Sequence, residues 1–296
     1  MTITRRAALR LLAATAGSLV LGGPGLARPG TGIRTRAIPS SGEKVPVIGL
    51  GTARTFDVGT AEAERAPLRE VLRQFFDHGG RVIDTSPMYG TAETVIGDLL
   101  GRIDHPEPFY ATKVWTRGEQ AGIRQMERSA ERLGTGVLDL MQAHNLVDWR
   151  THLDTLEGWK KEGRIRYLGI THHEVSAFDD LEAIMRKRDL DWVQLNYSLA
   201  TREAAERLLP LAADRGIAVL VNEPFHAGGL FRRVRGRELP DWAGEFGAES
   251  WAQLFLKYIL ANPAVTCVIP ATSDPEHMVD DIRAGYGALP DEAQRR

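Results

Sequence analysis

The stretch RVIDTS at positions 81–86 is a short hydrophobic run that ends in polar residues. Two later stretches repeat this form: FYATKV at 109–114 and VLDLMQAH at 137–144 are also apolar, β-rich runs with polar groups near their ends. We interpret each run as a buried strand that carries a functional group at its carboxyl end. The polar residues in question are Asp84, Lys113 and His144.

These three polar residues follow one another at intervals of about 30 positions, which is the length of one strand plus one helix. Three consecutive parallel strands therefore bring them to the same end of a barrel, where loops from different strands converge. Tyr89 lies shortly after Asp84, in the loop that leaves the first of these strands. Each residue alone has an ordinary structural explanation, but the set places a carboxylate, a phenol, an amine and an imidazole around one predicted pocket.

Strand-like and helix-like patterns alternate along the rest of the chain, without a change in composition that would mark a linker. Eight strand-like runs are present, the number that a closed barrel needs. The sequence therefore predicts an α/β fold, a (β/α)8 TIM barrel. The runs are 47–51, 81–86, 109–114, 137–144, 165–171, 192–197, 217–223 and 265–271.

Two segments lie outside this repeat. The stretch 34–47 contains Ser40-Ser41-Gly42-Glu43 between short extended segments, which predicts an N-terminal β-hairpin before the barrel. The insertion 226–247 has no strong period, and we interpret it as a long loop over the C-terminal face of the barrel.

The composition is that of an ordinary globular protein, with 43% hydrophobic and 26% charged residues. The net charge of -2 gives no reason to expect a nucleic-acid partner, and the arginines within 232–237 are interpreted as part of a solvated loop. Cys267 is the only cysteine, which excludes an intramolecular disulfide and a thiolate metal site.

The N-terminal segment is typical of an export signal. A twin-arginine sequence, Thr4-Arg5-Arg6-Ala7-Ala8-Leu9, is followed by a weakly apolar stretch and by small residues up to Ala27. We predict that residues 1–27 are recognised by the twin-arginine export machinery and that 28–296 form the barrel domain, in the periplasm or otherwise exported. The alternative is a cytoplasmic protein whose paired arginines are accidental. No later stretch reaches the roughly 18 apolar residues of a membrane helix, so no permanent membrane anchor is expected.

The four clustered residues suit proton transfer to a carbonyl oxygen. Tyrosine is a weak acid at neutral pH, but a nearby ammonium such as that of Lys113 favours the phenolate and lowers the pKa of the phenol. We expect Asp84 to hold Lys113 in place, and His144 to hydrogen-bond the carbonyl oxygen and orient it. Since none of these groups is an electron source, a reduction requires a bound hydride donor, for which a nicotinamide cofactor is the natural candidate.

The motifs DTSPMYG at 84–90, ATKVW at 111–115 and LMQAHN at 140–145 together resemble the aldo-keto reductase family. The resemblance implies a (β/α)8 barrel that binds NADPH without a Rossmann domain and reduces aldehydes or ketones to alcohols, with Tyr89 as the general acid. The absence of a Gly-x-Gly-x-x-Gly motif after a strand agrees with this interpretation.

The resemblance also suggests which residues contact the nicotinamide. Thr171 keeps the hydroxyl of the family's serine or threonine, whereas His172 replaces the asparagine that usually follows it. Gln194 matches a family glutamine that contacts the carboxamide. Asn222 stands where many members place an aromatic residue that stacks on the nicotinamide, so this stacking is lost, and Phe225 is the neighbouring candidate to replace it.

The segment 269–277 resembles the loop that holds the adenosine phosphate in this family. The family commonly supplies a lysine or arginine there for the 2′-phosphate, but this segment contains neither. Asp274 either repels that phosphate or accepts a hydrogen bond from a free ribose hydroxyl. We therefore predict a weakened preference for NADPH and acceptance of NADH. The candidate cofactor-binding residues here are Pro270, Thr272, Ser273, Asp274 and His277.

Two other functions fit parts of the sequence. A low-turnover, cofactor-binding or redox-sensing barrel would account for Asn222 and for the limited NADPH supply outside the cytoplasm. A metal-dependent barrel hydrolase would use His172 and His173, but adjacent residues on a strand point in different directions and no further ligand is evident. No metal site is therefore predicted. Candidates for an apolar substrate wall are Phe56, Trp115, Phe231 and Trp242.

Overall fold

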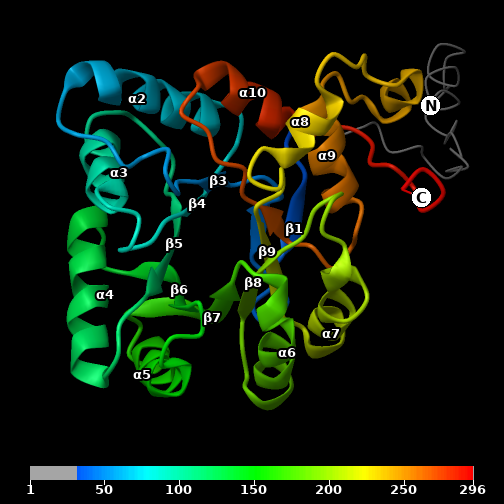
Figure 1. Cartoon of the computed structure of the whole chain (residues 1–296). Helices are drawn as coiled ribbons and strands as arrows, with labels where there is room; N and C mark the ends of the chain where they lie inside the picture. The colour runs from blue at the N-terminus through cyan, green and yellow to red at the C-terminus, as the bar shows by residue number, and fades with distance from the viewer. Residues whose placement is uncertain (1–31, 296) are drawn as a thin grey trace, which may run out of the picture.

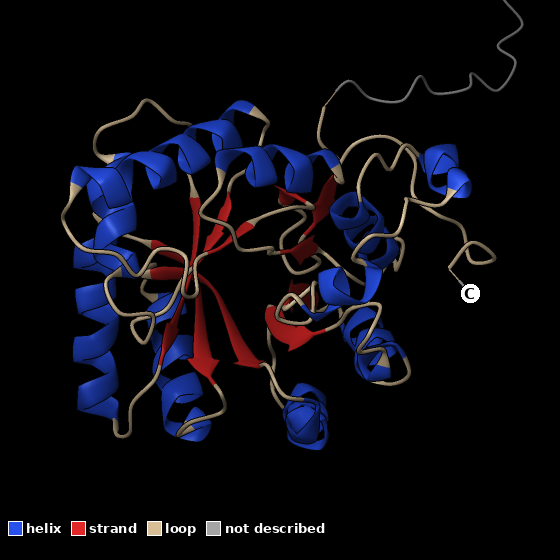
Figure 2. Cartoon of the chain, turned by 45° about the horizontal axis from the view of Figure 1, so that its top comes forward, coloured by secondary structure: helices blue, strands red, loops and turns tan. Residues whose placement is uncertain are grey.

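The barrel of this computed structural model is one sheet of parallel strands, and residues 32–295 are described. Eight strands follow the order β10-β9-β8-β7-β6-β5-β4-β3. The first and last strands meet through parallel bridges between Ile48 and Val268 and between Gly51 and Ala271. Figures 1 and 2 show the strands in the centre and the helices outside them. The predicted (β/α)8 barrel is confirmed, whereas the predicted export signal at 1–27 lies outside the described residues.

The strands agree with the predicted runs, and differ from them mainly in length. The first and last strands are the shortest, because their remaining contacts are single bridges and isolated hydrogen bonds. The strands are β3 (Leu50–Gly51), β4 (Val82–Asp84), β5 (Phe109–Val114), β6 (Leu138–His144), β7 (Ile165–His172), β8 (Trp192–Asn196), β9 (Ala218–Asn222) and β10 (Cys267–Val268).

A helix follows each strand and covers the outside of the barrel. In the first of them, Leu68, Val71, Leu72 and Phe75 are buried, because helical spacing places them on one face. The helices are α2 (Glu62–Asp77), α3 (Ala92–Leu100), α4 (Glu119–Leu133), α5 (Trp149–Lys161), α6 (Phe178–Lys187), α7 (Leu208–Arg215), α8 (Gly229–Val234), α9 (Trp251–Leu260) and α10 (Pro275–Arg283). Short 3-10 helices lie at Val175–Ala177, Glu203–Ala205 and Asp241–Phe246.

The lower half of the barrel interior is filled by large apolar side chains. Alternate residues of each strand point inward, and those at the amino ends form a separate buried cluster. Phe109 packs against Tyr167 and Trp192, with ring centroids 5.9 and 6.0 Å apart. The barrel is therefore closed at this level, and only its carboxyl end is free for a polar site.

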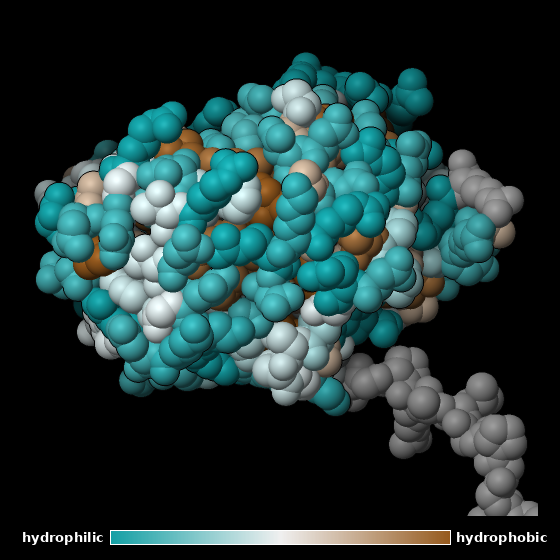
Figure 3. Space-filling view, turned by 90° about the horizontal axis from the view of Figure 1, so that it is seen from below, coloured by the Kyte–Doolittle hydropathy of each residue, from teal (hydrophilic) through white to brown (hydrophobic). Residues whose placement is uncertain are grey.

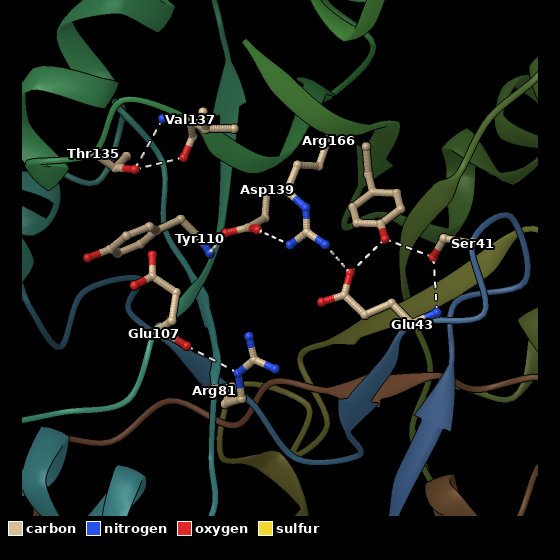
Figure 4. A network of polar contacts seen from close by, with 10 residues as sticks. Ser41, Glu43, Arg81, Glu107, Tyr110, Thr135, Val137, Asp139 and Arg166 are labelled. Carbon is tan, nitrogen blue, oxygen red and sulfur yellow. Dashed lines mark hydrogen bonds and ion pairs between the residues drawn. The ribbon is translucent and has the colours of Figure 1, made fainter. Parts of the chain in front are cut away.

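The predicted hairpin is confirmed, and it covers the amino end of the barrel. Strands β1 (Thr35–Ala37) and β2 (Lys44–Pro46) pair antiparallel. Glu43 accepts hydrogen bonds from Arg166 and from the hydroxyl of Tyr167, and Arg166 also bonds Asp139. Figure 4 shows this network, in which Ser41 also reaches the tyrosine hydroxyl. These polar contacts fix the hairpin across the floor of the barrel.

The insertion 226–247 is more ordered than the sequence predicted. It contains α8 and the 3-10 helix Asp241–Phe246, so its interpretation as a plain loop is wrong. Leu230, Ala243 and Phe246 pack with Phe255 of α9 in a small hydrophobic cluster of their own. These helices are too short to produce a periodic pattern, because each supplies only two or three apolar residues.

The outer surface carries hydrophilic side chains over most of the face seen in Figure 3, with small hydrophobic areas between them. Among residues 32–295, no helix is long and apolar enough to cross a membrane.

Candidate active site

The four residues singled out by spacing lie together at the carboxyl end of the barrel. Asp84, Lys113 and His144 end or nearly end β4, β5 and β6, and Tyr89 follows β4. Nζ of Lys113 donates to Oδ1 of Asp84 over 2.7 Å and to the carbonyl oxygen of Thr85 over 2.6 Å. The same nitrogen lies 5.0 Å from the centre of the Tyr89 ring, whose edge meets His144 at a centroid distance of 6.0 Å.

The ion pair between Lys113 and Asp84 is almost completely buried. Burial raises the pKa of Asp84, whereas Lys113 and Gln194 oppose this, the latter by donating from Nε2 to Oδ2 over 3.0 Å. For Lys113, burial acts to lower the pKa, but its neighbours, first of all the Asp84 carboxylate, outweigh this effect and raise it. Since both hydrogen bonds to Asp84 stabilise its carboxylate, we assign the pair as ionised.

Tyr89 keeps its proton in this environment. Burial raises the pKa of its phenol, and the nearby ammonium of Lys113 offsets only part of that increase. The charges of Asp84 and Glu223 raise the pKa further. Lys113 therefore acts on the pKa of Tyr89 in the predicted direction, but the loss of hydration has the larger effect, so the pKa of the phenol is raised. The phenol is protonated at neutral pH and has a proton to donate.

His144 is neutral in the folded protein. Burial, followed by the positive charge of Lys113, lowers the pKa of this imidazole from 6.5 to about 2. Its Nδ1 lies 3.1 Å from Oγ of Ser86, which is fully buried. Its Nε2 has no hydrogen-bond partner among residues 32–295, and His144 lines the adjacent cavity. The ring therefore has one nitrogen engaged by the protein and one available to a ligand.

A cavity of about 620 Å³ opens over this cluster. It is walled by the loops that follow several strands, so its position is the usual one for the active site of a (β/α)8 barrel. Its volume is sufficient for a small organic ligand. Besides Asp84, Tyr89 and His144, the lining includes Arg54, Met88, Asn145, His173, Glu223 and Phe225.

Three of the predicted nicotinamide contacts also line the cavity. Oγ1 of Thr171 donates to Oε1 of Gln194 over 2.7 Å, and Gln194 in turn donates to Asp84. Asn222 lies at the end of β9, and its buried Oδ1 has no partner among the described residues. Polar side chains therefore line this part of the cavity wall.

The structure does not bring His172 to the cavity. Its Nδ1 accepts a hydrogen bond from the backbone of Glu174 over 3.1 Å, and its ring stacks on that of His173. His173 lines the cavity instead, because alternate residues of a strand face the same side and Thr171 faces inward. Residues 32–295 contain no group of three or more His, Cys, Asp or Glu side chains that could hold a metal ion.

The segment after β10 lies at the edge of the site rather than inside it. Ala271 lines the cavity, and the carbonyl oxygen of Pro270 accepts from Gly51 to close the barrel. Asp274 is the N-cap of α10: its Oδ1 accepts from the backbone amides of Glu276 and His277, over 2.8 and 3.4 Å. The Oγ1 of Thr272 accepts from the amide of Asp274, and Ser273, Asp274 and His277 are exposed.

The predicted aromatic wall is not found. Phe56 is fully buried in the core, while Trp115, Phe231 and Trp242 are exposed and do not line the cavity. Phe225 does line it, and Phe231 packs behind Phe225 with a centroid distance of 4.8 Å. Exposure of these side chains could not be predicted, because Phe56 and Trp115 lie outside helices and strands, and Phe231 and Trp242 lie in helices too short for a clear period.

Known proteins resemble this chain over most of its length. The model of the Aldo/keto reductase family matches residues 47–295. The chain belongs to this family. An aldo-keto reductase from Klebsiella pneumoniae, whose crystal structure is a complex with NADPH, superposes with a TM-score of 0.73 at 29% identity; the match covers 88% of this chain and 92% of that one. A second structure from the same organism, with NADP and acetate, gives a TM-score of 0.73 at 30% identity, over 86% and 91% of the two chains.

Curated proteins that are named as oxidoreductases or reductases are also similar to this chain. The uncharacterized oxidoreductase YrpG of Bacillus subtilis is 27% identical, with 82% of this chain and 88% of that protein covered. The NADH-specific methylglyoxal reductase of Escherichia coli is 28% identical, over 56% of this chain and 58% of that protein.

Some residues at this site were not predicted from the sequence. Ser86, His173 and Glu223 all contact the site or line its cavity. The signal for His173 was the alternation of the strand that also carries Thr171. Ser86 stands two positions after Asp84, but a loop has no fixed period, so its approach to His144 was not visible in the sequence.

The neutral state of His144 predicts a loss of stability in acid. Below pH 6.5 the unfolded chain gains a proton on this ring that the folded chain does not bind, so this contribution to stability is complete above pH 6.5 and falls with decreasing pH. Between pH 7 and pH 5 the loss from this one group is about 2 kcal/mol. Between these pH values, the free energy of unfolding measured with urea should therefore fall by about 2 kcal/mol less in His144→Asn than in the wild type.

The exposed His277 provides the matched control for this experiment. His277→Asn should keep the pH dependence of the wild type. An equal pH dependence in His144→Asn and the wild type would contradict the assignment of a neutral, buried ring.

Proposed function

We propose that this protein is an NAD(P)H-dependent reductase that converts aldehydes or ketones to alcohols. The observation that carries the proposal is the cluster of Tyr89, Lys113, Asp84 and His144 at the base of a 620 Å³ cavity. Membership of the aldo/keto reductase family and the relatives that are named as reductases support it.

Tyr89 delivers the proton in this proposal. Its phenol is protonated and lines the cavity beside His144, so a carbonyl oxygen placed between the two rings meets two potential donors. Negative charge that develops on that oxygen makes Tyr89 the general acid, and the ammonium of Lys113, 5.0 Å from the ring, stabilises the phenolate that is left. Asp84 holds that ammonium in place. His144 donates from its free nitrogen and fixes the direction of the carbonyl group.

The residues of the cavity wall fit a nicotinamide ring. Thr171, Gln194 and Asn222 line this wall, and their hydroxyl and amide groups suit hydrogen bonds to a carboxamide. A reduced nicotinamide bound there supplies hydride to the carbonyl carbon. NADPH is the cofactor that the Klebsiella structure contains, and NADH is the one that the Escherichia coli relative's name gives. We propose that this chain uses either.

Removal of the phenol hydroxyl tests the role of Tyr89. Tyr89→Phe should lower kcat for carbonyl reduction by about 10²–10⁴-fold, the usual contribution of a general acid, with the Kd of the reduced cofactor unchanged. Tyr110→Phe removes a hydroxyl from a buried tyrosine that does not line the cavity, and should keep full activity. Steady-state kinetics with a panel of aldehydes gives the comparison. Wild-type turnover in Tyr89→Phe would remove Tyr89 from its role.

The segment after β10 predicts weak discrimination between the two cofactors. Residues 271–277 include no lysine or arginine, and the carboxylate of Asp274 occupies the N-terminal amides of α10. We expect the Kd values of NADH and NADPH to lie within about tenfold of each other in fluorescence titrations. A charged hydrogen bond to the 2′-phosphate would favour NADPH by about that factor, and this segment has no lysine or arginine to supply one. Ser273→Arg should strengthen NADPH binding and leave NADH binding unchanged. Much tighter binding of NADPH by the wild type would refute this prediction.

We further propose that the protein is exported through the twin-arginine pathway. The support is the order of Arg5-Arg6, an apolar stretch and small residues up to Ala27. Fractionation of cells that express the full chain should find it outside the cytoplasm, whereas the double variant Arg5→Lys/Arg6→Lys should remain inside. Arg10→Lys is the control for an arginine-to-lysine change outside the pair. Equal export of all three chains would contradict the proposal.

A further inference from the structure

Ser86 is a buried residue whose hydroxyl contacts His144 of the site. It lies in the loop between Asp84 and Tyr89 and is fully buried. Its Oγ is 3.1 Å from Nδ1 of His144 and accepts a hydrogen bond from the backbone amide of Met88 over 3.3 Å. Among residues 32–295, these are the hydrogen-bond partners of this hydroxyl.

The direction of the bond between Ser86 and His144 follows from the number of protons available. A serine hydroxyl has one proton to donate and two lone pairs to accept with. The amide of Met88 already uses one lone pair of Ser86. Nδ1 of His144 is the one acceptor in contact with this hydroxyl within the described chain. If Nδ1 carried a proton, the hydroxyl of Ser86 would be a buried donor without an acceptor, which is unfavourable.

We propose that Ser86 is a positioning residue that donates to Nδ1 of His144 and thereby holds the neutral ring in its Nε2–H tautomer. A neutral imidazole has one proton, so a hydrogen bond that requires Nδ1 to accept places that proton on Nε2. Nε2 is the nitrogen without a partner among residues 32–295, on a ring that lines the cavity. Ser86 thus determines that His144 meets a ligand as a donor and not as an acceptor.

This inference rests on the proposed function only for its consequence in catalysis. A carbonyl oxygen is an acceptor, so it binds to the Nε2–H form and is repelled by the lone pair of the other tautomer. Ser86 also sits in the same loop as Tyr89, whose amide donates to the carbonyl oxygen of Ser86 over 3.0 Å. The loop that follows Asp84 therefore carries the proton donor Tyr89 and, through Ser86, determines which nitrogen of His144 carries a proton.

The tautomer can be measured without any turnover. In full-length protein labelled with ¹⁵N-histidine, two-bond ¹H–¹⁵N spectra should show a protonated Nε2 and an unprotonated Nδ1 for His144, with the signals assigned by their loss in His144→Asn. Ser86→Ala should move His144 toward a mixture of tautomers. Ser86→Cys, nearly the same size but a weak donor, should give an intermediate spectrum. Ser129→Ala removes a buried hydroxyl that has no partner in the described chain, and should leave the His144 signals unchanged.

Kinetics gives the second readout. Ser86→Ala should lower kcat for carbonyl reduction by about tenfold, the factor associated with one hydrogen bond, with no change in the Kd of the reduced cofactor. In a His144→Asn background the same substitution should have no further effect. A protonated Nδ1 in the wild type, an unchanged His144 spectrum in Ser86→Ala, or an equal loss of kcat in the His144→Asn background would each overturn the proposal. A wild type that reduces no carbonyl would refute the proposed function, while the spectra would still decide the tautomer.

Discussion

The buried ion pair between Lys113 and Asp84 is the constraint on which the rest of the site depends. Moving two charges out of water is costly, and their attraction offsets this cost only with good geometry and further hydrogen bonds. Here Lys113 also donates to the carbonyl oxygen of Thr85, and Asp84 also accepts from Gln194. Removal of one partner would leave the other as an uncompensated buried charge, so the two strands that carry them are fixed relative to each other.

The barrel is what makes this geometry possible. Parallel pairing places Asp84 opposite Ala111, two residues before Lys113, and pairs His144 with Thr171 and Thr171 with Gln194. Inward-pointing residues therefore fall into levels around the axis. The lower levels are apolar and are covered by the hairpin, so water has access only from the carboxyl end. Low hydration there strengthens the electrostatic effect of Lys113 and at the same time opposes ionisation of the phenol.

The sequence predicted the barrel and the common position of Asp84, Lys113 and His144 because both depend on the order and spacing of strand-like runs, and Tyr89 was added because it follows Asp84 closely. Asp84, Lys113 and His144 each stand near the end of an apolar run, and the runs follow one another at intervals of about 30 residues, so their common position at one end of the barrel could be inferred. The features that could not be predicted have other causes. The short helix α8 is held by packing on α9 and not by a period of its own. The raised pKa of Tyr89 results from burial, which depends on loops from distant parts of the chain.

The cost of burying polar groups also applies to Asn222, where this chain departs from the family pattern. Its Oδ1 is buried without a partner, and such an acceptor costs about 1–3 kcal/mol when nothing bonds to it. An aromatic ring at that position would avoid this cost and offer stacking. An amide instead offers a directional bond, beside a row that already runs from Thr171 through Gln194 to Asp84. In the proposed function, the nicotinamide is therefore held through hydrogen bonds to its carboxamide and not by stacking from this position, on a wall whose polar groups are connected to the buried ion pair.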